Sequence, residues 1–175
     1  LTLARANEQI GSVESVNLAK LSQNCWQNIE TTDATIHLDI RTTQGITLKA
    51  DPNRLAQVFE NLMRNAIEHA RTQDDNNNNN VDNSENVTVT VGELADGFYV
   101  ADDGNGIPES EQDDVFDAGY TTNEQGTGFG LSIVKQVVEA HGWEISITDS
   151  AEGGARFEVT HVDVSRIESN QIQLE

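Results

Sequence analysis

The sequence predicts an α+β domain built as a two-layer α/β sandwich, in which helices cover one face of a mixed, mostly antiparallel sheet. Three observations predict this fold class. Segments with helical spacing of apolar residues are interspersed with short β-rich segments. The last four predicted strands follow one another in adjacent pairs, which favours antiparallel pairing. Apolar residues make up 36% and aromatic residues 5% of the 175 residues, so a single core must consist mainly of Leu, Val, Ile and Ala.

The first predicted elements are helical. Residues 1–10 are interpreted as the end of a helix. Residues 16–29 place apolar side chains at helical spacing, and Ser15 is the predicted N-cap of this second helix. Residues 34–38 and 45–50 alternate or run apolar, which predicts two strands around a turn.

A longer helix is predicted next. Asp51-Pro52 supplies an N-cap carboxylate followed by proline at the first helical position, and the apolar stripe behind it continues to about Ala70. Residues 72–86 are polar and of low complexity, which predicts a surface loop.

The second half predicts four strands and one helix. Strands are expected at 87–91 and 98–101, around a turn at 95–97, and again at 143–148 and 155–161. Residues 102–128 are rich in Asp and Gly and predict a long loop, which in a compact domain is usually functional. A helix is expected over 129–141, ended by Gly142, and residues 165–175 are expected to be a frayed tail.

The charge balance excludes several classes of partner. The formal net charge is −20, from 30 acidic and ten basic residues, so nucleic acid and anionic membranes would be repelled. Lysine is scarce, and an acidic, lysine-poor surface is typical of proteins adapted to very high salt, as in a halophilic archaeon. An ordinary acidic protein is the alternative.

The compartment is predicted from cysteine usage and hydropathy. Cys25 is alone and lies in an apolar helical stripe, so we interpret it as a core residue in a reducing, cytoplasmic compartment. No apolar run approaches the roughly 20 residues that span a membrane, and no signal peptide is evident. Because the chain starts at Leu1, we expect it to be a piece of a longer protein that could carry a membrane anchor.

Asn61 and Asn65 are the first candidate site residues. They are four residues apart and share one face of the predicted helix, although asparagine is a poor helix former. An amide oxygen can occupy one position of an octahedral Mg²⁺ shell, which is one interpretation; a pair of solvated amides is the other.

Asp102 begins the second candidate segment, which ends in Gly104-Asn105-Gly106-Ile107-Pro108. The glycines allow close approach of the backbone to a ligand, and a carboxylate at a strand end can accept a hydrogen bond from an exocyclic amine. An acidic turn or a calcium loop is the alternative, although the regular oxygen ligands of a calcium loop are missing.

Two glycine runs complete the set. Gly126-Thr127-Gly128-Phe129-Gly130-Leu131 opens a helix, where free N–H groups and the helix dipole favour an anion. The run is neither a Walker loop nor a Rossmann fingerprint. Gly153-Gly154-Ala155-Arg156-Phe157, taken alone, indicates only a turn into the last strand.

In this order the four segments are specific. The sequence resembles the superfamily of gyrase, heat-shock chaperone, histidine kinase and mismatch-repair ATPases (GHKL, with the Bergerat ATP-binding fold), and within it the catalytic HATPase_c domain of two-component sensor histidine kinases. Residues 59–71 are similar to the N box, 102–108 to the G1 box, 115–117 to the F box, 126–135 to the G2 box and 153–157 to the last glycine motif. The resemblance covers about residues 47–162.

The resemblance implies cofactors and roles. ATP and Mg²⁺ are the implied cofactors, with Asn65 holding Mg²⁺ and Asp102 reading the adenine amino group. Residues implied to contact the nucleotide are Gly104, Gly106, Ile107, Gly126, Thr127, Gly128, Phe129, Gly130, Leu131 and Lys135. His69 occupies the position of an adenine-packing aromatic, or is a surface histidine at a helix end. The segment from about Pro108 to Thr127 would be a mobile lid.

Asn61 separates kinase from hydrolase. ATP hydrolases of the superfamily have a glutamate four residues before the metal-binding asparagine, and that position is Asn61 here. Glu60 points about 100° away around the helix. Without a general base water is a poor nucleophile, whereas phosphoryl transfer to a neutral imidazole depends mainly on positioning and charge stabilisation.

Three departures from the kinase pattern bear on phosphate binding. Glu68 stands where many such kinases have lysine, Ala155 replaces a hydroxyl residue, and no Lys or Arg occurs from Ala101 to Val134. Mg²⁺, backbone N–H groups and Lys135 or Arg64 would then neutralise the phosphates, and we expect weak nucleotide affinity at low salt.

The resemblance also implies a division of the chain. Residues 1–29 would be the end of a dimerisation helix and a linker helix, 30–164 the catalytic domain, and 165–175 a tail. His37 lies in a predicted strand, His141 at a helix end and His161 in the last strand, and none of the three lies mid-helix beside an acidic residue. The acceptor would therefore be on a separate dimerisation domain of a homodimeric kinase, with a response regulator downstream. A protein-serine kinase of anti-sigma-factor type, or an ATPase or binding module without phosphotransfer, is the alternative.

Overall fold

The computed structural model describes residues 10–29, 37–41, 46–71, 87–117, 119, 130–151 and 153–166, with the backbone alone at 37–41 and 69–71. Its larger sheet has five strands in the order β2-β4-β5-β7-β6. The strands are β2 (His37–Arg41), β4 (Thr88–Leu94), β5 (Gly97–Asp102), β7 (Ala155–Thr160) and β6 (Glu144–Asp149). Only the β2–β4 pair is parallel among these. The predicted mixed, mostly antiparallel sheet is thus confirmed.

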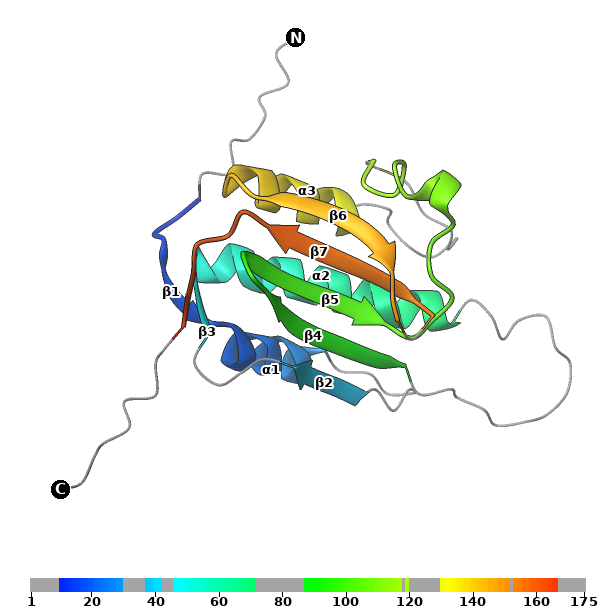
Figure 1. Cartoon of the computed structure of the whole chain (residues 1–175), viewed down its shortest axis with the longest axis horizontal. Coiled ribbons are helices and arrows are strands. Elements are labelled where there is room, and N and C mark those ends of the chain that lie inside the picture. Colours follow the sequence, from blue (N-terminus) through cyan, green and yellow to red (C-terminus); the bar gives the residue numbers. More distant parts are fainter. Residues whose placement is uncertain are drawn as a thin grey trace, which may run out of the picture.

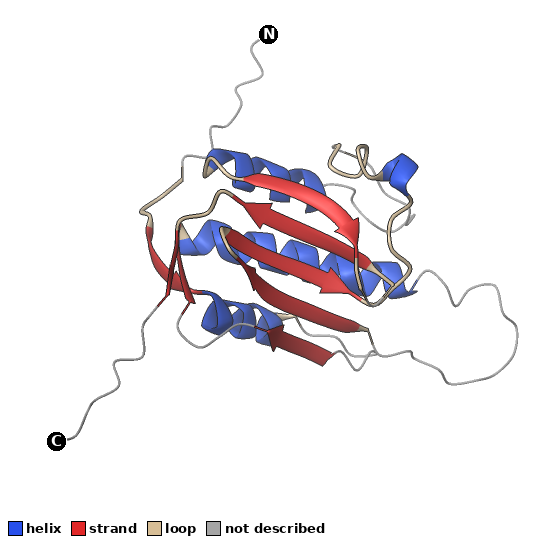
Figure 2. Ribbon diagram, in the orientation of Figure 1, coloured by secondary structure: helices blue, strands red, loops and turns tan. Residues whose placement is uncertain are grey.

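Three helices lie on one face of this sheet, which completes the predicted two-layer sandwich (Figures 1 and 2). They are α1 (Leu18–Asn28), α2 (Pro52–Arg71) and α3 (Gly130–Ala140). α2 runs along the middle of the sheet, and α3 packs beside it in the opposite direction (Figure 1). None of the described helices is long and apolar enough to cross a membrane.

Two of the helices have the ends that the sequence predicts. The Oδ1 atom of Asp51 accepts the N–H groups of Asn53 at 3.0 Å and Arg54 at 3.3 Å, so Asp51 caps α2. α3 ends at Ala140, and Gly142, which has a φ of 78°, closes it two residues later. There the N–H groups of Gly142 and Trp143 bind the carbonyl oxygens of Glu139 and Val138 at 2.9 and 3.0 Å.

A second, three-stranded antiparallel sheet is a feature that the sequence did not predict. It consists of β1 (Glu14–Asn17), β3 (Ile46–Ala50) and β8 (Val164–Arg166), in the order β1-β3-β8. The predicted pairing of 34–38 with 45–50 around a turn is therefore wrong, because β2 and β3 belong to different sheets. Residues 165 and 166, predicted as part of a frayed tail, are in β8; residues 167–175 lie outside the described part.

The N-cap of α1 is also different from the prediction. Ser15 lies inside β1, and α1 begins at Leu18 with Asn17 as its cap. The Oδ1 atom of Asn17 accepts the N–H of Lys20 at 2.9 Å. Residue 15 is part of a strand because its backbone pairs with Lys49 of β3, and the helix can start only after that pairing ends.

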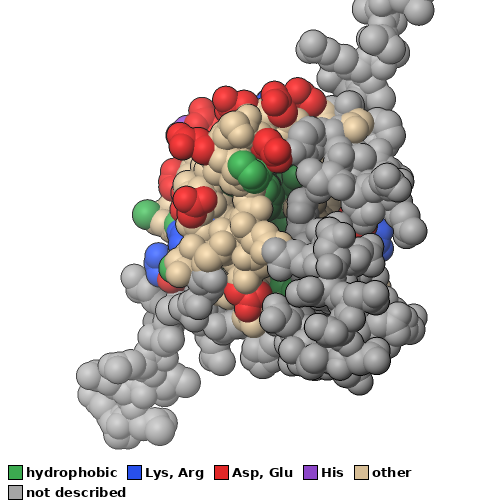
Figure 3. Space-filling view, turned by 90° about the vertical axis from the view of Figure 1, so that its right-hand side faces the viewer, with side chains coloured by type: hydrophobic (Ala, Val, Ile, Leu, Met, Phe, Trp, Pro, Cys, Tyr) green, Lys and Arg blue, Asp and Glu red, His purple; other side chains and the backbone are tan. Residues whose placement is uncertain are grey.

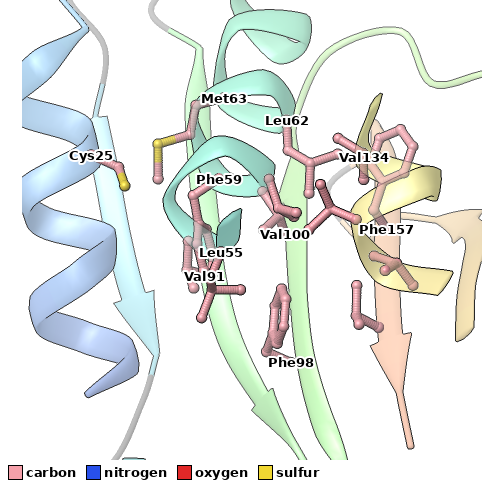
Figure 4. Packing of buried hydrophobic residues seen from close by; sticks show 14 of the residues in the cluster. Cys25, Leu55, Phe59, Leu62, Met63, Val91, Phe98, Val100, Val134 and Phe157 are labelled. Carbon is pink, nitrogen blue, oxygen red and sulfur yellow. The ribbon is translucent and has the colours of Figure 1, made fainter. Parts of the chain in front are cut away.

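The core lies between the helices and the larger sheet (Figure 4). Phe59 of α2 and Phe98 of β5 are both fully buried, with ring centroids 5.1 Å apart. Val134 of α3 and Phe157 of β7 continue this core toward β6. A fully buried side chain of this size contributes about 1.5–3 kcal/mol, so these contacts hold α2 and α3 firmly on the sheet.

Candidate functional site

The amide pair on α2 lies where a second helix begins. Asn61 and Asn65 are both half-buried on α2. Gly130 is the first residue of α3, and a Cβ atom there would lie 3.8 Å from the Oδ1 atom of Asn61. The structure thus brings the predicted Asn61 close to the start of α3, where backbone N–H groups lack helical partners and favour an anion.

The start of α3 is held in place by its first turns. Leu131 is 8% exposed and Val134 is fully buried, so the helix is anchored on the core directly after Gly130. The predicted contact residues Gly126, Thr127, Gly128 and Phe129 lie outside the described residues, as does the side chain of His69.

Asp102 is the last residue of β5 and is held by the backbone around it. Its side chain is buried, and its Oδ1 atom accepts the N–H groups of Gly104 at 3.0 Å and Ala155 at 3.3 Å. A Cβ atom on Gly154 would overlap the carbonyl group and Oδ1 of Asp102. Glycine is therefore required at 154. The last glycine motif packs against Asp102, a contact that its sequence alone did not indicate.

The loop after Asp102 is shaped by further backbone contacts. Gly106 has a φ of 72°, which favours glycine. Ile107 is buried and its carbonyl oxygen accepts the Nε2 amide of Gln112 at 3.1 Å. Asp103, to which sequence reasoning gave no separate role, accepts the N–H of Thr88 at 2.8 Å and so ties the loop to the start of β4.

The first part of the predicted lid packs on the domain. It includes a short 3₁₀ helix, Glu109–Glu111, followed by the buried Val115. Phe116 makes an edge contact with Phe157, with ring centroids 6.3 Å apart. The Nζ atom of Lys135, a predicted phosphate ligand, lies 6.0 Å from the Phe116 ring centroid and 4.0 Å from Glu139. Lys135 therefore sits beside the base of the lid.

Acidic side chains gather along one edge of the end of the molecule that carries the lid (Figure 3). In the described part of the predicted lid, Glu109, Asp113, Asp114 and Asp117 are exposed. Since no Lys or Arg occurs between residues 72 and 134, basic side chains of the lid cannot offset this charge.

Comparison with known proteins adds to this geometry. The model of the histidine kinase-, DNA gyrase B- and HSP90-like ATPase family (HATPase_c) matches residues 50–166. The chain belongs to this ATPase family. The match contains every described site residue discussed above, and membership of the family supports ATP binding.

Several curated relatives of this HATPase_c domain are histidine kinases. The sensor histidine kinase ZraS of Escherichia coli K12 is 30% identical over 151 residues, which are 83% of this chain and 30% of ZraS. Sporulation kinase A of Bacillus subtilis is 31% identical over 150 residues, or 84% of this chain and 23% of that kinase. The chain thus spans less than a third of the length of these two relatives.

Solved structures show the same fold. A mycobacterial sensor histidine kinase, MprB, matches with a TM-score of 0.66 and 22% identity, over 88% of this chain and 97% of that one. The catalytic domain of the histidine kinase ThkA matches with a TM-score of 0.65 and 25% identity, over 85% and 94%. Full-length ShkA, solved in complex with AMPPNP, matches with a TM-score of 0.67 and 22% identity, over 89% of this chain and 32% of ShkA.

Proposed function

We propose that this chain is the ATP·Mg²⁺-binding catalytic domain of a histidine kinase, which donates the γ-phosphoryl group to a histidine on a separate dimerisation helix in two-component signalling. The observation that carries the proposal is the side chain that faces the start of α3. That side chain is the amide of Asn61, where an ATP hydrolase of the superfamily has a carboxylate.

The donor set of α2 fits magnesium. Asn65 would hold the ion through its amide oxygen, with phosphate and water oxygens completing the shell. When bound, Mg²⁺ supplies positive charge that neutralises the phosphates. The amides themselves carry no charge, so the chain's contribution is to orient the ion relative to the start of α3, where the N–H groups of Gly130 and Leu131 would face phosphate oxygens.

The adenine would bind at the other side of the site. Asp102 would accept a hydrogen bond from the exocyclic amino group, because its carboxylate is oriented by two backbone N–H groups. Gly104, Gly106 and Ile107 would line the approach of the nucleotide, and His69 is proposed to pack on the base. The glycines of 126–128, with Thr127, Phe129 and Lys135, are proposed as further phosphate contacts.

Glu60 does not replace the missing general base. Its charge acts on Cys25 of α1, where it is one cause of a raised thiol pKa. Cys25 lies on the opposite side of α2 from Val134 of α3 (Figure 4). The charge of Glu60 thus lies near α1, whereas the Asn61 amide lies near the start of α3, and activation of water by this helix is disfavoured.

The acceptor and partners must come from elsewhere in the kinase. His37 lies in β2, His141 directly after α3 and His161 after β7, so these three lack the mid-helix position that we expect of an acceptor. His69, near the end of α2, is proposed to pack on the base instead. We propose a homodimeric kinase with a dimerisation domain that carries the histidine, a response regulator downstream, a cytoplasmic location for this domain and a surface adapted to high salt.

The test is reconstitution with the dimerisation helices of the same kinase and γ-labelled ATP in molar KCl. Acid-labile label on the dimerisation helices supports the proposal. Release of free phosphate without labelled protein would instead indicate a hydrolase, and acid-stable label on a partner protein would indicate a serine kinase. Asn65→Asp and Asp102→Asn should each abolish nucleotide binding; unchanged binding by both variants would show that the pocket is misplaced.

A further inference from the structure

Three parts of the chain meet at the end of the domain opposite the lid. The start of α2, the end of α3 and the chain that enters at Gly11 all lie at this end (Figure 1). Asp51 contacts all three through hydrogen bonds to Gly11, Asn53, Arg54 and His141. The proposed nucleotide chemistry uses none of these groups.

The two carboxylate oxygens of Asp51 serve different segments. Oδ1 caps α2, whereas Oδ2 accepts the N–H of Gly11 at 2.7 Å. A helix cap needs only one oxygen, so the second bond, across 40 residues, is additional to capping. Burial alone would raise the pKa of this carboxyl, but the N–H groups of Gly11, Arg54 and Asn53 outweigh burial and lower it. The carboxylate is thus ionised at neutral pH and accepts three backbone N–H groups.

His141 joins Asp51 to α3. The N–H of Asp51 donates to Nε2 of His141 at 3.2 Å, and Nδ1 lies 2.8 Å from the carbonyl oxygen of Val137. Because Nε2 accepts and Nδ1 faces an acceptor, the ring is neutral with its proton on Nδ1. The ring stacks on the buried Trp143, with centroids 4.2 Å apart. The contacts of its two nitrogens and the stacking on Trp143 therefore fix the position of the imidazole.

The entering chain has little freedom at this point. A Cβ atom on Gly11 would lie 2.9 Å from Oδ2 of Asp51, so a side chain there would require this carboxylate to shift. Three residues later β1 begins, and Glu14 pairs with Ala50, the residue before Asp51. The path of the chain from Gly11 is thus tied to the first turn of α2.

We propose that Asp51 is a positioning residue that couples the chain entering at Gly11 to the nucleotide site, with His141 as its contact to α3. The inference rests on the proposed function. α2 and α3 are joined at this end through Asp51 and His141, and they face each other at the other end through Asn61 and Gly130. A nucleotide bound between α2 and α3 restrains the position of one helix relative to the other. Because Asp51 is bonded to both helices and to the Gly11 N–H, the same restraint limits the motion of Gly11.

Coupling between two sites is reciprocal, which gives two independent readouts. Binding of ATP·Mg²⁺ should slow hydrogen exchange of the Gly11 amide. In return, loss of the Gly11 bond should weaken nucleotide binding. A carboxylate that only stabilises the fold would change neither quantity in a domain that remains folded.

Asp51→Asn is the sharpest variant, because asparagine caps helices as well as aspartate. If the side-chain oxygen of the new asparagine accepts the N–H of Asn53, its NH₂ group faces the N–H of Gly11. Two donors then face each other, and the bond to Gly11 is lost. We expect the dissociation constant for ATP·Mg²⁺ in molar KCl to rise about fivefold or more, which is the lower range of typical coupling. Loss of one negative charge alone would tighten triphosphate binding, so the expected direction is opposite to a simple charge effect.

Two further variants make the test independent of one substitution. Gly11→Ala leaves the α2 cap intact and disturbs the same bond from the other partner, so it should weaken binding in the same direction and carries the test if Asp51→Asn does not fold. Asn17→Ala is the matched control: it removes the cap of α1, which does not line the site, and should leave nucleotide affinity unchanged.

The experiment is calorimetric titration of each variant with ATP·Mg²⁺, together with hydrogen exchange at Gly11 with and without nucleotide. Slowed exchange in the unmodified chain and weaker binding by both linkage variants support the inference. If the unmodified chain binds nucleotide but either Gly11 exchange or the affinity of both variants is unchanged, the inference is overturned and the proposed function stands. If the unmodified chain binds no nucleotide, both are refuted.

Discussion

Gly154→Ala tests the position of Asp102 most directly. The added Cβ would lie 2.6 Å from the carbonyl carbon of Asp102, whereas unstrained carbon contacts are about 3.5–4.0 Å. The turn must therefore move by about 1 Å. Overpacking of this kind costs about 1–3 kcal/mol, and loss of the bond from the Ala155 N–H to Asp102 adds about 0.5–1.5 kcal/mol. We expect the free energy of unfolding to fall by about 1.5–4.5 kcal/mol.

Nucleotide binding should fall further than this loss of stability explains. Oδ1 of Asp102 would be overlapped by the same methyl group, so the carboxylate proposed to read adenine must turn away. We expect ATP·Mg²⁺ affinity to drop at least tenfold in protein that is still folded, equivalent to about 1.4 kcal/mol. Urea denaturation measures the stability, and calorimetric titration at a temperature where the variant is native measures the affinity.

Gly97→Ala is the matched control on the same pair of strands. A Cβ there would overlap the backbone of Val159 in β7, with the carbonyl carbon at 2.8 Å, but at the opposite end of β5 from Asp102. It should destabilise the domain by a similar amount and leave affinity unchanged. Equal affinities for Gly154→Ala and the unmodified chain, with both glycine variants destabilised alike, would show that Asp102 does not contact the nucleotide.

Three further predictions follow from charge and burial. The folded-state pKa of Asp51 is lowered, so the stability that this carboxylate contributes is present above its unfolded pKa of about 3.9 and is lost as pH falls through the folded value. Urea denaturation between about pH 5 and 2 should show this loss of stability, and the loss should be absent in Asp51→Asn. Burial, and then Glu60, raises the pKa of the Cys25 thiol to about 11, so an aromatic disulfide reagent at pH 8 should label it only on unfolding. Salt should tighten ATP binding between about 0.1 and 2 M KCl, because it screens the repulsion between the acidic lid and the triphosphate.

Each of these has a contrary outcome. If the free energy of unfolding still falls by the same amount at acid pH in Asp51→Asn, the pH dependence comes from other carboxylates. Labelling of Cys25 as fast in buffer as in denaturant would mean that α1 opens readily from α2. Weaker nucleotide binding at higher salt would mean that attraction by basic groups outweighs the lid.

Elements with strong local signals were predictable from the sequence. α2 begins where Asp51 and Pro52 predicted, because a cap needs only residues within one turn. Gly142 closes α3 just after Ala140 for the same reason. The β1–β3–β8 sheet could not be predicted, since β3 pairs with residues more than 100 positions away in β8, and no local pattern specifies that partner.

The same division holds for the site. Asp102, Gly106 and the two asparagines could be selected from the sequence as candidates, because their residue types are unusual at a strand end or within a helix, and their roles toward a nucleotide stay predictions. The contact of Gly154 with Asp102 was not predictable, since it depends on the register that pairs Ala101 with Arg156. Asp103 and His141 were missed for a similar reason: their partners, Thr88 and Asp51, are distant in the sequence.

The charge of the domain and the chemistry proposed for its site are mutually consistent. A lysine in the lid would attract phosphate over a distance, and molar salt would largely remove that attraction because the screening length is only about 3 Å at 1 M. Backbone N–H groups at the start of α3 and an ion held by Asn65 act at contact distance, where screening is weak. At high salt, the absence of Lys and Arg from 72 to 134 therefore costs little phosphate affinity, and this segment keeps its acidic surface.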